Sequence, residues 1–252
     1  MHPSAATAEV AALLRGPRRS AEIVYRSRHA VYVRDRDHHL AVLSRDAVAV
    51  PCGLQTTWPD VDAVHSVVLG DGRCSVDGHD LQVRRFVEAR VSPVADRWPG
   101  RPLPVGPLVD EVGTFLDLPR ALGGRTPYAA LQADDDAAVG ALLGRGPGLT
   151  PLGDDVLAGW LVARYALGHR GGHVAAAVLR RAPAWTTTVS AALLVHAVRG
   201  EAVPQLRALV EGVGRPDADQ RLADLRGVGH TSGVGLALGV ALAAPSPAAA
   251  AA

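Results

Sequence analysis

Residues 146–168 read GPGLTPLGDDVLAGWLVARYALG, in which a glycine and proline turn leads into a long apolar stretch. Threonine is a good N-cap, and proline suits the first helical position because the amide hydrogen that it lacks would have no partner there. The sequence therefore predicts a helix that starts at Pro151 with Thr150 as its N-cap. Arg164 is the only charge in the body of this helix, so we expect other helices to enclose it on most sides.

Asp154 and Asp155 lie in the first turn of this helix, on faces that are otherwise apolar. Carboxylates in a first turn interact favourably with the helix dipole, by about 0.3–1 kcal/mol, and a purely structural cap is one interpretation. An unpaired charge on an enclosed face costs several kcal/mol, however, which favours a functional pocket with a partner for these acids. A Mg²⁺ ion held by the carboxylates would fit, as would a ligand bridged by an arginine.

A second turn, in GVGHTSGVGLALGVALA at residues 227–243, has the same pattern of glycines, hydroxyl residues and an apolar helix. Free backbone amides at such a helix start bind phosphate or carboxylate groups. The turn carries a candidate general acid and two hydroxyl residues that could orient an anion or only cap the helix, namely His230, Thr231 and Ser232. Gly235 and Gly239 lie one helical turn apart, and we interpret them as packing residues that permit close helix contact.

A third segment, WTTTVSAALLVHAVRGE at residues 185–201, places hydroxyl residues ahead of and along another apolar helix. Only one of them can be the N-cap. The others either face the same cavity as the aspartates or bond back to the preceding turn, and the sequence leaves both alternatives open for Thr187, Thr188 and Ser190.

Short apolar runs with period-two alternation fill residues 20–95 and predict strands. Asp-Gly steps at 71–72 and 77–78 suit two-residue hairpin turns, because both residue types tolerate positive φ. From residue 105 to 244 the apolar period lengthens to that of helices separated by glycine or proline. The predicted fold class is α+β, with an N-terminal antiparallel β domain followed by a mostly α-helical C-terminal domain.

The proline-dense segment 92–107 marks the boundary between the two predicted domains, because proline interrupts strand ladders and helices alike. Residues 1–19 are expected to be an N-terminal extension, and the alanine-rich residues 245–252 a disordered tail. No signal-peptide pattern is present and the apolar runs are too short and glycine-rich to span a bilayer, so a cytoplasmic protein without membrane contact is expected.

All 26 basic residues are arginine, which excludes Schiff-base lysine chemistry and a Walker-type phosphate loop. The 25 acidic residues nearly cancel them and leave a net charge of +1, so no extended basic face for nucleic acid is expected. The two cysteines lie outside any CxxC or Cys/His cluster, which argues against a disulfide framework and a zinc site. A small, locally recognised ligand is the better expectation.

The stretch GRGPGLTPLGDDVLAG at residues 144–159, with TTTVSAALLVHAVRGE and GHTSGVGLALG after it, resembles the AllH-like family, described as a subunit of oxamate carbamoyltransferase. The resemblance implies two partner subunits, one similar to acyl-CoA synthetases, and the interconversion of oxalurate plus phosphate with oxamate plus carbamoyl phosphate during allantoin breakdown in purine catabolism. It implies a site of Gly148, Thr150, Pro151, Gly153, Asp154, Asp155, His230, Thr231, Ser232 and Gly233. The chain departs from the family pattern at Leu152, where serine is usual, and lacks an acid often found near Val234 or Gly235.

Residues and resemblance together give one expected site, a pocket where the helices that start at 151 and 232 converge. The expected catalytic residues are Asp154, Asp155 and His230, with both aspartates as candidate Mg²⁺ ligands. The expected substrate-binding residues are Arg145, Gly146, Gly148, Thr150, Gly153, Thr231, Ser232 and Gly233. We expect a small anionic substrate such as carbamoyl phosphate or oxamate and protein partner subunits; the alternative function is a non-catalytic scaffold or regulatory subunit of a metabolic complex.

Overall fold

The computed structural model describes the chain except for residues 95–97, 99–102, 119–124 and 245–252. The chain divides into two compact units, Met1–Ala89 and Arg90–Ala252, which are described separately below. The tail that the sequence predicts to be disordered, residues 245–252, lies outside the described residues, as does part of the proline-dense segment 92–107.

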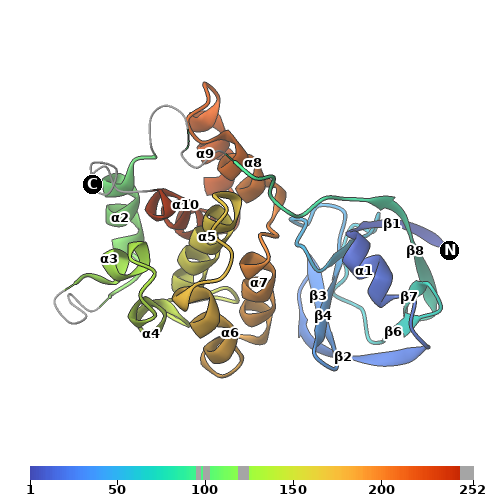
Figure 1. The fold of residues 1–252 in the computed structure, drawn as a ribbon. Helices are drawn as coiled ribbons and strands as arrows, with labels where there is room; N and C mark the ends of the chain where they lie inside the picture. The colour runs from blue at the N-terminus through green and yellow to red at the C-terminus, as the bar shows by residue number, and fades with distance from the viewer. Residues whose placement is uncertain (95–97, 99–102, 119–124, 245–252) are drawn as a thin grey trace. The chain divides into compact units, whose positions relative to one another are not determined.

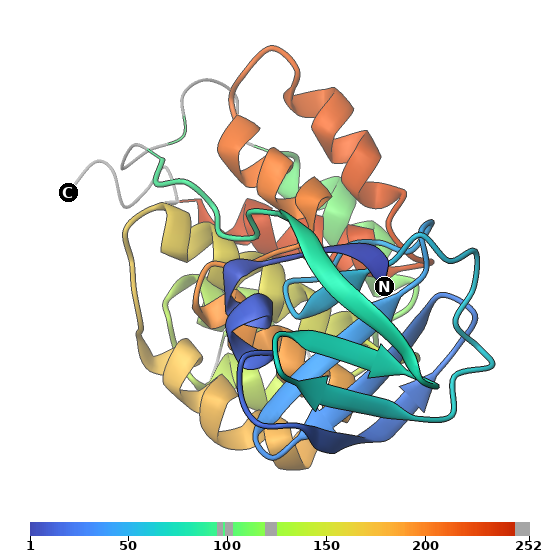
Figure 2. The same cartoon turned by 90° about the vertical axis from the view of Figure 1, so that its right-hand side faces the viewer.

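The first unit is a closed barrel of eight strands in the order β1-β5-β4-β3-β2-β6-β7-β8 (Figures 1 and 2). The strands are β1 (His2–Ala6), β2 (Arg19–Arg26), β3 (Ala30–Asp35), β4 (His38–Leu43), β5 (Gly53–Gln55), β6 (Val67–Gly70), β7 (Arg73–Val76) and β8 (His79–Phe86), and a short helix, α1 (Ala8–Leu13), follows β1. Apolar side chains such as Val31, Leu54 and Leu69 are fully buried in its core. Residues 1–19, expected as an extension, thus contribute a strand to the barrel.

The prediction of an antiparallel β domain is wrong, because the sheet is mixed. β1 pairs in parallel with β8, and β4 pairs in parallel with β5, whereas the remaining pairs are antiparallel. The two Asp-Gly hairpins are confirmed, with Asp71 and Asp77 at positive φ between neighbouring antiparallel strands. A tight turn identifies two consecutive strands as antiparallel partners. Parallel partners cannot be joined by a tight turn, so no local pattern of turn residues indicates which strands form the parallel pairs.

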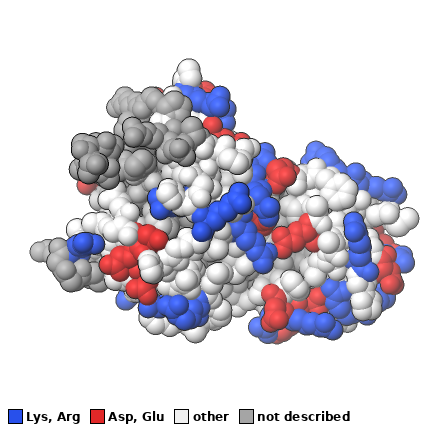
Figure 3. All heavy atoms as spheres, in the orientation of Figure 1, with Lys and Arg blue, Asp and Glu red and all other residues white. Residues whose placement is uncertain are grey.

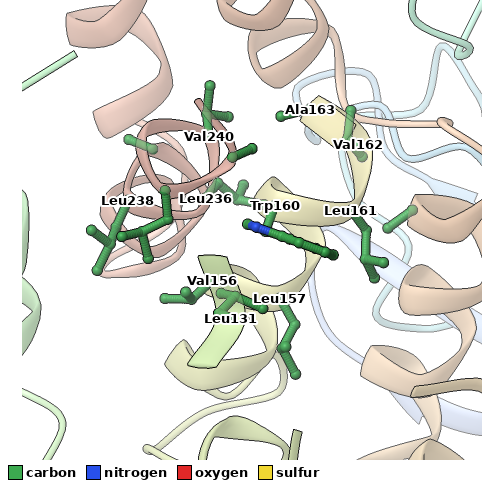
Figure 4. Close-up of a cluster of buried hydrophobic side chains, with 14 of the residues drawn as sticks. Leu131, Val156, Leu157, Trp160, Leu161, Val162, Ala163, Leu236, Leu238 and Val240 are labelled. Atoms are coloured by element: carbon green, nitrogen blue, oxygen red, sulfur yellow. The ribbon is translucent and has the colours of Figure 1, made fainter. Parts of the chain in front are cut away.

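The second unit is helical over its described residues. Its helices are α2 (Val105–Gly113), α3 (Pro127–Gln132), α4 (Ala137–Leu142), α5 (Leu152–Ala166), α6 (His173–Trp185), α7 (Thr188–Val198), α8 (Pro204–Gly212), α9 (Ala218–Arg226) and α10 (Ser232–Ala243). α5 and α10 pack against each other at the centre of this unit (Figure 1). The indole ring of Trp160, 1% exposed, lies among apolar side chains of these two helices (Figure 4).

Glycines bring α5 and α10 into close contact. A Cβ atom at Gly159 would lie 2.1 Å from the carbonyl oxygen of Leu236, and one at Gly239 would lie 2.2 Å from that of Val156. A Cβ atom at Gly235 would come within 2.9 Å of the Cβ atom of Asp155. The interpretation of Gly235 and Gly239 as packing residues is confirmed, and the contact sets the first turn of α10 against Asp155.

The Gly159→Ala substitution is expected to lower the free energy of unfolding by about 1–3 kcal/mol, because the added methyl group would overlap a backbone carbonyl that cannot move without shifting α10. Chemical denaturation of the full chain measures this change. Gly113→Ala, in α2, is the matched control, because a Cβ atom there meets nothing within 4 Å. Equal stabilities for the two variants would contradict the close packing of α5 and α10.

The surface carries mixed charge. On the face drawn in Figure 3, arginine and acidic side chains are interspersed. Ion pairs such as Arg226 with Glu111, at 2.6 Å, match part of this charge within the helical unit. Among the described residues, the helices are too short or too polar for any of them to span a membrane.

Candidate functional site

Asp154 is a buried carboxylate with donors on both oxygens. It lies in the first turn of α5 and is 1% exposed. Its Oδ1 accepts a hydrogen bond from the backbone N–H of Gly144 at 2.6 Å, and its Oδ2 accepts one from the Ser190 hydroxyl at 2.5 Å and one from the Thr186 hydroxyl. Burial raises the pKa of Asp154, and these three hydrogen bonds counteract part of that rise. Asp154 therefore ties the start of α5 to the preceding loop and to the start of α7.

The start of α7 makes a further link to the loop that precedes α5. Thr187 is the N-cap of α7, because its hydroxyl oxygen accepts a hydrogen bond from the backbone N–H of Ser190 at 3.0 Å. The same hydroxyl donates to the carbonyl oxygen of Leu149 at 2.5 Å. Thr188, the third hydroxyl residue considered from the sequence, is exposed. The prediction from sequence included Thr187 and Ser190 as possible partners of the aspartates but did not include Thr186. The run of three threonines before an apolar helix is the signal that could have identified it.

Asp155 has a different environment from its neighbour. It is 6% exposed, and its Oδ2 has no hydrogen-bond partner among the described residues. Burial raises the pKa of Asp155 well above its ordinary value, the Asp154 charge adds to the rise, and the hydroxyls of Ser232 and Thr150 oppose it. Buried polar atoms are usually paired, so the unpaired carboxyl oxygen beside two hydroxyls makes Asp155 a candidate for ligand binding.

The Thr150 and Ser232 hydroxyl oxygens lie 3.0 Å apart and are hydrogen-bonded, although the residues are 82 positions apart in the sequence. The expected convergence of the two helix starts is thus present at this contact. The prediction that Thr150 is the N-cap of α5 is wrong. Pro151 occupies that position without a side-chain capping bond, and α5 begins at Leu152. The first amides of α5 bind carbonyl groups instead, Gly153 to Arg145 at 2.9 Å and Asp154 to Pro151 at 2.8 Å.

The other residues expected at the second turn occupy varied positions. His230 is exposed, and its ring packs edge-on against Phe115 with ring centres 6.2 Å apart. Thr231 is half-buried and is the N-cap of α10, but its side chain makes no capping bond. A Cβ atom at Gly233 would lie 2.0 Å from the Leu225 carbonyl oxygen, so close packing accounts for this glycine. In the part of the chain that the structure describes, no hydrogen bond or ion pair joins His230 to Asp154 or Asp155.

The loop before α5 is shaped by glycines. Gly144, Gly146 and Gly148 have φ angles of 72°, 98° and 104°, a region that other residues rarely adopt. Gly146, Gly148 and Arg145 are exposed. Gly153 is buried, and a Cβ atom there would lie 2.0 Å from the Leu142 carbonyl oxygen. The motif therefore combines an exposed turn with buried close-packing positions.

The aspartate pair does not fit a Mg²⁺ site. Mg²⁺ requires near-octahedral oxygen coordination and usually keeps several waters. Both oxygens of Asp154 already accept hydrogen bonds from protein donors, and burial favours the neutral form of Asp155. Across the described ranges, no third carboxylate, histidine or cysteine groups with these two acids as a metal-ligand set. We therefore derive no chemical step through a metal ion.

A second buried polar network lies at the other end of α7. The Glu201 carboxylate, 9% exposed, interacts with His196 Nδ1 at 2.6 Å and accepts a hydrogen bond from the Arg90 guanidinium at 2.8 Å. Burial raises the pKa of Glu201. The hydrogen bonds and charges of His196 and Arg90 lower this pKa by more than burial raises it, so the net shift is downward. The glutamate that ends the third sequence segment thus has a structural role.

This network predicts a loss of stability in acid. Because the pKa of Glu201 is lower in the folded chain, its contribution is complete above its ordinary pKa of 4.5 and is lost as the pH falls through the folded pKa. The free energy of unfolding of the wild type should therefore fall more steeply below pH 4.5 than that of Glu201→Gln. Denaturant titrations at several pH values measure both slopes, and parallel curves would contradict the prediction.

Comparison with known proteins bears on the same helices. The model of the family described as "Oxamate carbamoyltransferase subunit AllH" matches residues 142–244. No solved structure matches the chain. The matched residues include the loop before α5, the start of α7 and the turn before α10, so the resemblance stated from the three motifs is confirmed for the part of the chain that carries them.

Proposed function

We propose that this chain, whose residues 142–244 match the AllH family, is a carbamoyltransferase subunit that binds a small anionic substrate in its helical unit. The proposed reaction, carried out with partner subunits in allantoin breakdown, interconverts oxalurate plus phosphate with oxamate plus carbamoyl phosphate. The observation that supports the site most strongly is Asp155. This buried acid has an unpaired oxygen and faces hydroxyls from two turns that are far apart in the sequence.

Asp155 suits the proton transfer that this reaction needs. When oxalurate reacts with phosphate, a carbon–nitrogen bond breaks, a carbon–oxygen bond to phosphate forms, and the departing nitrogen of oxamate must gain a proton. Burial favours the protonated form of Asp155, so this side chain can donate that proton and take it back in the reverse direction. General acid catalysis of this kind contributes about 10²–10⁴-fold to a rate.

The other site residues have supporting roles in this proposal. Asp154 is a positioning residue, because its oxygens are occupied by Gly144, Ser190 and Thr186. Arg145 and His230 are exposed on the segments that flank Thr150 and Ser232, where the guanidinium charge of Arg145 and a ring N–H of His230 would favour an anionic phosphate or carboxylate group. The backbone amides of the turn with Gly146 and Gly148, together with Thr231, would complete the contacts with the anion.

Ligand-dependent melting of the full chain tests the proposal. A ligand that binds only the native state raises the melting temperature as its concentration rises. We expect oxamate and carbamoyl phosphate to raise it in the wild type and to have little effect on the Thr150→Val/Ser232→Ala double variant, whose own melting temperature serves as the baseline. Wild-type melting that is unaffected by either compound would instead favour a non-catalytic subunit.

A further inference from the structure

We propose that Asp155 recognises the primary amide of the substrate while the Ser232 hydroxyl receives its carboxylate, so that the site selects a small molecule with both groups. This inference rests on the function proposed above and specifies how oxamate is oriented. It follows from the placement of one unpaired acceptor, on Asp155, beside the hydroxyls of Thr150 and Ser232.

The unpaired oxygen of Asp155 calls for a donor from the ligand. Among the described residues no side chain or backbone group supplies a hydrogen bond to Oδ2, and the atom is buried. A carboxylate or phosphate oxygen has no proton to donate, whereas the –NH₂ group of an amide has two. A neutral carboxyl group carries one donor and one acceptor, which match the donor and acceptor of a primary amide in two parallel hydrogen bonds. Burial of Asp155 raises its pKa and so favours this neutral form.

The Ser232 hydroxyl, at the start of α10, suits the other end of the ligand. α10 has twelve residues and no acidic side chain in its first turn, so the positive end of its dipole is not offset by a carboxylate of its own. Ser232 begins the helix, and its hydroxyl faces Asp155. The amides of Gly233 and Val234 already donate to the carbonyl groups of Val228 and Thr231, so the donor for a carboxylate is the Ser232 hydroxyl. A carboxylate bound by this hydroxyl would place the adjacent amide of a two-carbon molecule within reach of Asp155.

Entry of the ligand requires the Thr150–Ser232 hydrogen bond to open. The two residues are half-buried, whereas Asp155 behind them is buried. Rotation of either hydroxyl side chain would break the 3.0 Å contact between them and open the way to Oδ2. Both hydroxyls could then bind the ligand, so the loss of their mutual hydrogen bond is offset.

Calorimetric titration of the full chain with oxamate, pyruvate and oxalate tests this inference. Pyruvate replaces the amide nitrogen with a methyl group of similar size, and oxalate replaces it with an oxygen that cannot donate. The wild type is expected to bind oxamate at least about tenfold more tightly than either analogue, because each lacks the donor that Asp155 requires. Equal affinity for oxamate and pyruvate, or no binding of any of the three, would overturn the proposal.

Variants at position 155 locate the source of this selectivity. Asp155→Leu, which has a similar shape and no acceptor, should bring the affinity ratio of oxamate to pyruvate close to one. Asp155→Asn retains one acceptor oxygen and should retain part of the ratio, which keeps the test valid if the leucine variant does not fold. Asp117→Asn, at an exposed position, is the control and should show the wild-type ratio. An unchanged ratio in Asp155→Leu, or in Asp155→Asn and Asp117→Asn alike, would overturn the proposal.

Turnover of the complex with its partner subunits separates this inference from the proposed function. If the wild type selects oxamate through Asp155 but the complex forms no carbamoyl phosphate from oxalurate and phosphate, amide recognition stands and the transferase function fails. If the complex turns over but Asp155→Leu selects oxamate as the wild type does, the function stands and the role of Asp155 in amide recognition fails.

Discussion

Replacement of Asp154 by alanine is expected to lower the free energy of unfolding by at least about 3 kcal/mol. Three donors lose their acceptor in this variant: the Ser190 hydroxyl, which is buried, and the Gly144 amide and Thr186 hydroxyl, which are half-buried. A buried donor left unsatisfied costs about 1–3 kcal/mol. Urea denaturation of the full chain, followed by circular dichroism, measures the change.

Asp117→Ala is the matched control for this measurement, because Asp117 is exposed and surface substitutions usually change stability by less than about 0.5 kcal/mol. Asp154→Asn should also be destabilised, since its amide nitrogen would face donors on one side. A stability of Asp154→Ala within about 1 kcal/mol of the wild type would show that the three hydrogen bonds do not hold these segments together.

Asp155→Asn is expected to lower turnover of the reconstituted complex by about 10²–10⁴-fold, the range that general acid catalysis contributes, because an amide cannot transfer the proton. Its free energy of unfolding should be equal to or higher than that of the wild type, since the substitution removes a buried acid with an unpaired oxygen. Initial rates of carbamoyl phosphate formation and urea denaturation measure the two quantities.

The comparison with Asp154→Asn makes this second prediction specific. Adjacent residues in one helix turn should give opposite results, a loss of stability at position 154 and a loss of turnover in a stable protein at position 155. Wild-type turnover in Asp155→Asn would remove Asp155 from the chemistry. A stability loss as large as that of Asp154→Asn would mean that both acids serve mainly to hold the fold.

Much of the helical unit could be predicted from local pattern. The turn and apolar stretch around Pro151 predicted the start of α5 to within one residue, and Gly235 and Gly239 predicted the close packing of α10 against another helix. The N-cap of α5 was predicted wrongly because the hydroxyl of a threonine before a helix can either cap that helix or form a hydrogen bond with a distant segment. Capping depends on the chain nearby, whereas the hydrogen bond from Thr150 to Ser232 depends on a segment 82 residues away.

The barrel and the different environments of the two acids could not be predicted from local sequence patterns, because both depend on contacts between segments that are distant in the sequence. Hairpin residues such as Asp71 identify antiparallel neighbours. The parallel pair of β1 and β8, however, consists of the first and the last strand of the first unit in sequence. Asp154 and Asp155 are chemically identical in the sequence. Only the tertiary structure gives one of them three donors and leaves the other with an unpaired oxygen.

The central claim is that the loop before α5 and the turn before α10 form one ligand site around Asp155. Amide chemical-shift mapping of the isotope-labelled full chain during titration with oxamate tests it most directly. We predict that the shifted amides cluster at residues 144–155 and 230–235, with smaller changes at the start of α7 through Thr187. Changes confined to other segments, or no change at saturating oxamate, would contradict the claim.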